Sequence, residues 1–81
     1  MNPDSLDIDR IPKGEVEYYV NALLAEADNP LHHNAISYIE VAQRLLDRFP
    51  EPELNENEKR RWKNLQDIIN IYKKEYVGCP V

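Results

Sequence analysis

The stretch NPLHHNAISYIEVAQRLLDRFP, residues 29–50, decides the fold. Its apolar residues recur at intervals of four, three, four, three and four residues, which is the repeat of one face of an α-helix. Asn29 is a favoured N-cap, Pro30 suits the first helical position, and Pro50 disfavours helical geometry in the residue before it. The sequence therefore predicts a helix over residues 30–49, with an inward stripe of Leu31, Ala35, Tyr38, Ala42, Leu45 and Phe49.

A second amphipathic stretch precedes this one. Pro12 suits a first helical turn, because its missing N–H would find no partner there. The following apolar residues keep helical spacing as far as residue 28. We expect a helix over residues 12–28, with an inward stripe of Val16, Val20, Leu23 and Ala27, widened by Tyr19 and Leu24.

A third helix follows an acidic connection. Asn55 and Glu58 resemble a capping box, and Gly78 suits a left-handed cap at the far end. The stripe between them consists of Trp62, Leu65, Ile69, Tyr72 and Tyr76, with Ile68 beside it. Short connections make successive helices antiparallel neighbours. The sequence thus predicts an all-α fold, a small antiparallel three-helix bundle with helices over about residues 12–28, 30–49 and 56–77.

The ends of the chain are expected to lie outside this bundle. Residues 1–11 have the composition of a flexible acidic arm. Their apolar members Leu6, Ile8 and Ile11 alternate with acids, so the arm either packs on the body or adds to a partner. A chain of 81 residues makes at most one domain. We assign that domain to residues 12–78 and a tail to residues 79–81.

Composition restricts the function. The net charge of −5 argues against general binding to nucleic acid, which needs a basic footprint. No apolar run spans a membrane and no signal peptide is evident, so we expect a cytoplasmic protein. The chain has no phosphate loop, nucleophile motif or metal-ligand spacing, and we expect no enzyme activity, cofactor or metal. His32 and His33 are adjacent rather than one turn apart, and Cys79 is the one cysteine.

Charge is distributed unevenly. Residues 1–28 sum to −5, residues 50–58 to −4 and residues 59–81 to +4. The cations concentrate in KRRWK, residues 59–63, near a helix N-terminus, where they oppose the helix dipole. One interpretation is internal pairing of the basic third helix with the acidic first. The other is a cationic patch, with Arg60, Arg61 and Lys63 binding a phosphate or an acidic partner.

Three apolar residues fall outside the inward stripes. Tyr18 lies nearly opposite the first stripe, and Ile36 and Ile71 each lie about 130° from the centre of theirs, at 100° per residue. Such residues indicate a partner or self-association surface if they join others, such as Val41 or Val77, in one patch.

The stretch from Ala35 to Phe49, with Ala and Tyr facing inward, resembles tetratricopeptide-like hairpins and the small three-helix MIT trafficking modules. The tetratricopeptide Trp-Leu-Gly-Tyr signature is absent, and no site residue carries over. We predict a non-enzymatic interaction module that binds a larger protein as inhibitor, adaptor or regulator, as small phage or plasmid accessory proteins do. The alternatives are a nucleic-acid-associated protein using the basic start of the third helix, a homo-oligomeric protein such as a homodimer, and a metal protein or enzyme using His32, His33 and Cys79.

Overall fold

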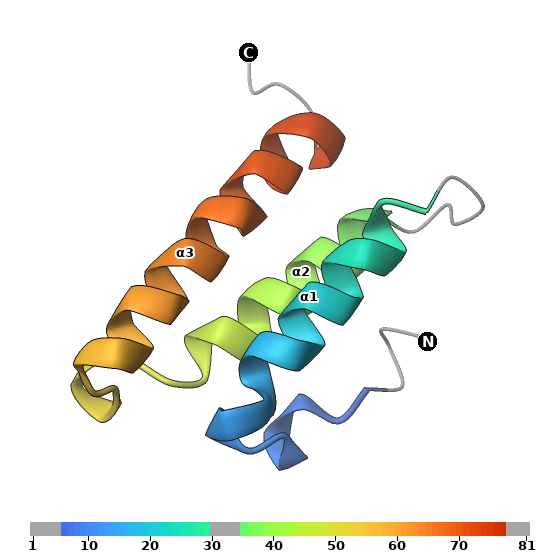
Figure 1. The fold of residues 1–81 in the computed structure, drawn as a ribbon. Helices are drawn as coiled ribbons and strands as arrows, with labels where there is room; N and C mark the ends of the chain where they lie inside the picture. The colour runs from blue at the N-terminus through green and yellow to red at the C-terminus, as the bar shows by residue number, and fades with distance from the viewer. Residues whose placement is uncertain (1–5, 30–34, 78–81) are drawn as a thin grey trace.

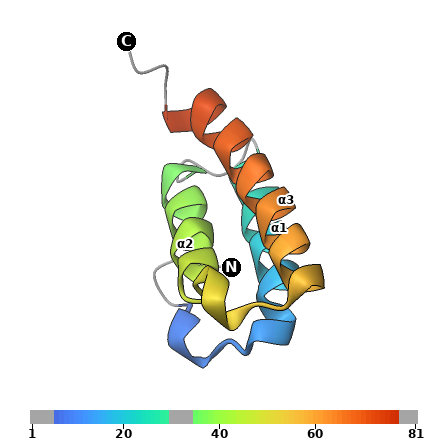
Figure 2. The same cartoon turned by 90° about the vertical axis from the view of Figure 1, so that its left-hand side faces the viewer.

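The computed structural model of this chain describes residues 6–29 and 35–77. Three α-helices pack against one another: α1 at Val16–Ala27, α2 at Ala35–Asp47 and α3 at Glu56–Tyr72. α2 runs antiparallel to the other two, as both ribbon views show (Figures 1 and 2). The described residues contain no strand. The predicted all-α three-helix bundle is confirmed.

The helix ends differ from the predicted ones for local reasons. Before α1, Lys13–Glu15 form a tighter 3-10 turn; Gly14 is a weak helix former, and no side chain caps the turn. α2 ends at Asp47, two residues before the predicted end, and Phe49 closes a tight turn by donating to Leu46 O at 3.4 Å. The predicted start of this helix at residue 30 lies outside the described residues.

The start of α3 is the best-predicted boundary. Asn55 Oδ1 accepts from the Glu58 amide at 2.8 Å, and Glu58 Oε1 accepts from the Asn55 amide at 2.9 Å. This reciprocal pair is the capping box expected from the sequence, and the helix begins at Glu56. At its other end α3 widens into a π-helical turn, Lys73–Val77.

One apolar core joins all three helices. The inward stripes supply most of it, and Val16, Val20, Leu23, Ile39, Leu45 and Ile69 are fully buried. The core also includes Ile11, Val41 and Leu54, which belong to no predicted stripe. Ile11 lies one residue before the expected start of the domain.

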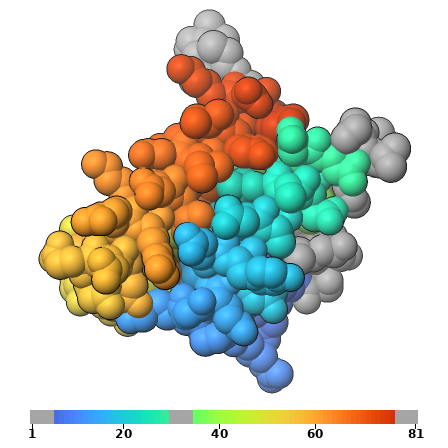
Figure 3. Space-filling view, viewed as in Figure 1, coloured from blue at the N-terminus to red at the C-terminus, as the bar shows by residue number. Residues whose placement is uncertain are grey.

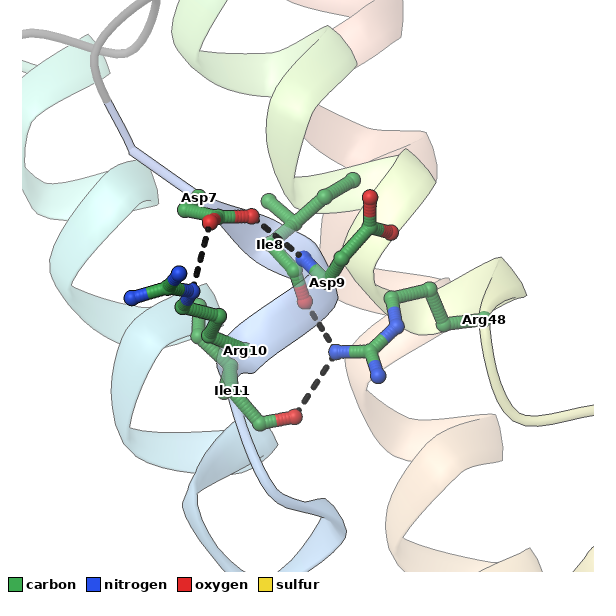
Figure 4. A network of polar contacts seen from close by, with 6 residues as sticks. All are labelled: Asp7, Ile8, Asp9, Arg10, Ile11 and Arg48. Atoms are coloured by element: carbon green, nitrogen blue, oxygen red, sulfur yellow. Dashed lines mark hydrogen bonds and ion pairs between the residues drawn. The ribbon is translucent and has the colours of Figure 1, made fainter.

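Residues 6–11 lie against the bundle, which is one of the two arrangements left open for the arm; residues 1–5 lie outside the described part. Ile11 is 5% exposed, and Leu6 and Ile8 pack partly buried against the core. Arg48, the residue that follows α2, donates from one guanidinium nitrogen to Ile8 O and, at 2.7 Å, to Ile11 O (Figure 4). Of the two alternatives, packing on the body is the one observed.

Val41 was expected among the off-stripe apolar residues of the surface. It is instead 8% exposed. Arg48 follows the end of α2 and lies seven residues after Val41, about two helical turns along the same face. Because Arg48 holds Ile8 and Ile11, the segment it binds runs along the Val41 face. Val41 belongs to the same apolar core as Ile11, against which Leu6 and Ile8 pack.

Polar contacts at the two ends of the bundle define how α1 and α3 align. Lys13 Nζ lies 3.2 Å from Glu58 Oε1, and Tyr76 Oη donates to Asp28 Oδ1 at 2.6 Å. The paired residues are 45 apart in sequence at one end and 48 at the other. α1 and α3 therefore run parallel, with residues about 45–48 apart at the same level.

A polar contact joins α2 to α3. Gln43 and Gln66 exchange amide hydrogen bonds of 2.7 and 2.8 Å, and Lys73 Nζ donates to Gln43 Oε1 at 2.7 Å. These groups lie at the edge of the core, on the side where α3 meets α2. They identify which side of α3 faces α2, which bears on the site described next.

Candidate functional site

An open cleft of about 670 Å³ lies where α2, the 50–55 connection and the start of α3 meet. Its apolar lining comes from Leu46, Leu54 and Trp62, each mostly buried. Around this lining stand charged and polar side chains: Glu51, Glu56, Lys59, Arg60, Lys63 and Gln66. The cleft thus combines an apolar floor with three cations and two carboxylates.

The connection that forms one wall is fixed in place by Lys13. Its ammonium donates to Glu53 O at 3.1 Å and forms the ion pair with Glu58. The Asn55 amide, followed by Lys13 and Arg61, lowers the pKa of the Glu58 carboxyl below its ordinary value of 4.5. Glu58 is therefore ionised at neutral pH, and it anchors both the α3 cap and the start of α1.

The cations of the cleft differ in how they are engaged. Lys59 Nζ lies 3.6 Å from Glu56 Oε1, one turn earlier on the same helix. Arg60 and Lys63 are exposed and form no ion pair with another described residue. Two of the predicted partner-binding cations therefore face the cleft with free charge.

The cations of residues 59–63 oppose the helix dipole less than the sequence suggested. The first turn of α3 holds Glu56 and Glu58, which suit the positive end of the dipole. The cations begin at Lys59, in the second turn. Because the dipole effect falls off within the first turn, these cations carry little electrostatic penalty.

Trp62 is in the core as expected, and it also lines the cleft. It is 8% exposed and meets the Phe49 ring edge to face, with centroids 6.3 Å apart. Its indole Nε1 is buried and finds no hydrogen-bond acceptor among the described residues. Arg48 forms a cation–π contact with Phe49, with its guanidinium carbon 4.9 Å from the ring centroid.

The off-stripe apolar residues are exposed as predicted: Tyr18 by 70%, Ile36 by 44% and Ile71 by 58%. They stand on three different helices. By the alignment of α1 with α3, Ile71 lies level with residues 23–26, roughly 8–12 Å along the bundle from Tyr18. Tyr18 and Ile71 are therefore more than one helical turn apart along the bundle. Tyr18 packs edge to face on Tyr19, with centroids 5.3 Å apart.

Ile68 is more exposed than its position beside the inward stripe of α3 suggested. It was expected to flank the inward stripe of α3, but it is 38% exposed. It lies one turn from Ile71, so these two isoleucines are neighbours on the surface of α3. The helical period already indicated that Ile68 and Ile71 are neighbours, since both fall on the same side of the inward stripe of α3. Arg61 does not line the cleft, and the side chain of Val77 is outside the described part.

At the other end of the bundle, Tyr72 and Tyr76 make contacts that hold the fold together. Tyr72 and Tyr76 stack with centroids 5.9 Å apart. The hydrogen bond to Asp28, with burial and nearby negative charge, raises the pKa of Tyr76 to about 12. Burial, with Asp28 and Glu75, raises the pKa of Tyr72. Both phenols are protonated at neutral pH.

The remaining predictions concern metals and membranes. His32, His33 and Cys79 lie outside the described residues. Within residues 6–29 and 35–77, no group of three or more His, Cys, Asp and Glu side chains is placed to hold a metal ion. None of the described helices combines the length and apolar character that crossing a bilayer requires.

Comparison of the chain with protein-family models, with curated proteins and with solved structures finds no match.

Proposed function

We propose that this chain is a non-enzymatic interaction module that binds an acidic segment of a larger protein in the cleft at the start of α3. The observation that carries the proposal is the pairing of an apolar floor with free cations. Arg60 and Lys63 have no ion-pair partner among the described residues, and they border a cleft floored by Trp62. The role is that of an inhibitor, adaptor or regulator acting through contact.

The chemistry of the lining selects the partner. An apolar side chain on the floor becomes an anchor of the kind that dominates interface energetics. Carboxylates beside that anchor meet Lys59, Arg60 and Lys63, which steers encounter and sets orientation.

The acids around the cleft favour a peptide over a nucleic acid. Glu51 and Glu56 line it together with the cations, and the chain as a whole carries −5. A phosphate backbone presents continuous negative charge and is repelled by those carboxylates. A peptide can place its acids on the cationic side alone. The cytoplasmic location expected from the sequence suits such a partner.

Selection from a random peptide library tests the proposal. The wild-type chain is the bait, and Lys63→Glu is the counter-selection. Enriched peptides are expected to carry one large apolar residue flanked by Asp or Glu. They should bind Lys63→Glu about tenfold more weakly, because an attraction at the rim becomes a repulsion.

The matched control is Lys74→Glu, which makes the same charge change at an exposed position outside the cleft. It should leave peptide binding within about twofold, since distant surface charges are screened by salt. Peptides without acids, or equal weakening by both variants, would contradict the proposal. Tighter binding of a single-stranded oligonucleotide than of any selected peptide would favour the nucleic-acid alternative.

A further inference from the structure

A second stripe runs along α3 beside the one that fills the core. The core stripe falls at residues 62, 65, 69, 72 and 76. The second falls one residue earlier at every point and comprises Arg61, Asn64, Ile68, Ile71 and Glu75. One residue is about 100° of rotation, so this stripe lies to one side of the core stripe. All five of its members are exposed.

Two members of this stripe, Ile68 and Ile71, are apolar and lie one helical turn apart, as neighbouring residues of a helix–helix seam do. Apolar residues alternating three and four apart pack between two helices at a shallow angle. The core stripe of α3 uses this spacing against α1 and α2. The outer stripe repeats it where no described segment covers it, and α3 lies at the edge of the bundle in both ribbon views (Figures 1 and 2). Figure 3 shows this helix along one side of the molecular surface.

Charge identifies what can cover the stripe. Arg61 lies seven residues before Ile68 and Glu75 seven residues after it. Neither forms an ion pair with another described residue. The π turn at Lys73–Val77 contains more residues per turn than an α-helix, which rotates Glu75 toward the Ile71 side and keeps it on this face.

We infer that the outer stripe of α3 binds a second copy of this chain in an antiparallel, two-fold symmetric dimer. In that arrangement the isoleucines of the two copies meet at the centre. Arg61 of each copy lies opposite Glu75 of its partner, so the same pair forms twice. A parallel dimer would instead place like charges together at both ends. The stripe is thus self-complementary in one orientation only.

This interface and the cleft are centred on different sides of α3, and they adjoin where Arg60 of the cleft precedes Arg61 of the stripe. The cleft lies on the side of α3 that faces α2, where Leu46 and Gln66 line it. At 100° per residue, Lys63 is about 140° around the helix from Ile68 and about 80° from Ile71. The proposed dimer and the proposed peptide binding are therefore tested by different measurements.

Sedimentation of the full chain at increasing concentration tests the inference, up to about 1 mM because two isoleucines per copy make a small interface. The average mass is expected to rise toward that of a dimer. Arg61→Glu alone and Glu75→Arg alone should each weaken association about tenfold, since both symmetric pairs become repulsive. The double variant Arg61→Glu/Glu75→Arg should restore association to near the wild-type value.

Two isoleucine variants complete the test. Ile71→Ser should weaken association at least about tenfold, because its side chain is lost from both sides of the centre. Ile36→Ser removes an equally large exposed side chain from α2 and should leave association unchanged. Circular dichroism reports whether each variant remains folded. A wild-type chain that stays monomeric at the highest concentration, or a double variant no better than the single ones, overturns the inference.

Discussion

Replacing Arg48 by methionine tests whether residues 6–11 belong energetically to the bundle. Methionine keeps an unbranched apolar stem beside Phe49 and removes the guanidinium. The change deletes the hydrogen bonds to Ile8 O and Ile11 O and the contact with the Phe49 ring. A hydrogen bond to a charged group contributes about 1.5–3 kcal/mol and an exposed cation–π contact about 0.5–1 kcal/mol.

The expected loss is smaller than the sum of these values. Arg48 is only partly buried, and both carbonyls accept from water once the segment is released. We therefore expect Arg48→Met to lower the free energy of unfolding by about 2 kcal/mol. Urea denaturation followed by the fluorescence of Trp62 measures this change. Arg44→Met is the matched control, since Arg44 is an exposed arginine one turn earlier on α2, and it should fall within about 0.5 kcal/mol of wild type.

Hydrogen exchange locates the effect. The Ile11 amide donates to Ile8 O at 3.3 Å, so its protection reports whether the segment is docked. A loss of 2 kcal/mol should speed its exchange about thirtyfold. Ile11→Ala should cost about 2–5 kcal/mol, and combining it with Arg48→Met should cost less than the sum, because either change releases the same segment. If Arg48→Met behaves like Arg44→Met in both assays, docking of residues 6–11 contributes nothing and the reasoning is refuted.

Three further predictions concern the core and its titrating groups. Leu45→Ala should lower the free energy of unfolding by about 2–5 kcal/mol in urea denaturation, because this side chain is fully buried; a loss below about 1 kcal/mol would show that the site is loosely packed. Tyr76 should titrate near pH 12 in ultraviolet absorbance, and Asp28→Asn should lower that pKa. The stabilising hydrogen bond from Tyr76 to Asp28 is fully present below pH 10 and is lost as the pH rises through about 12. Because the pKa of Glu58 is lowered, its contribution is present above about pH 4.5 and is lost as the pH falls through the folded value. Glu58→Gln should therefore flatten the acid limb of the stability curve.

The sequence was sufficient for the parts of the fold that depend on local rules. Helical spacing placed Val20, Leu45 and Ile69 in the core, and the capping residues located the start of α3. These features need only neighbours three or four residues away. Sequence reasoning therefore recovered the bundle and most of its core without knowledge of the packing.

Other features depend on contacts between distant segments. Arg48 holds a segment 37–40 residues away in sequence, and Ile11 of that segment is buried in the same core as Val41, a pairing that no local pattern reveals. Ile68 lies near the core stripe on the helical wheel, yet it is exposed on the uncovered side of α3. Which side is covered follows from the order of the three helices in space.

The candidate site was predicted only in part, because its lining also comes from segments that are distant in sequence. Charge clustering identified Arg60 and Lys63, which line the cleft, and Arg61, which does not. The floor of the cleft comes from Leu46 and Leu54, which belong to separate elements and approach only in the folded chain.

The proposed function rests on the cleft, and Trp62 provides a probe within it because it is the one tryptophan of the chain. The most direct test is a fluorescence titration with a synthetic peptide in which glutamates flank a central phenylalanine. The account predicts a saturable change in Trp62 emission, weakened about tenfold by Lys63→Glu and by no more than about twofold by Lys74→Glu. An emission spectrum that does not change, or a titration that both variants weaken equally, would contradict it.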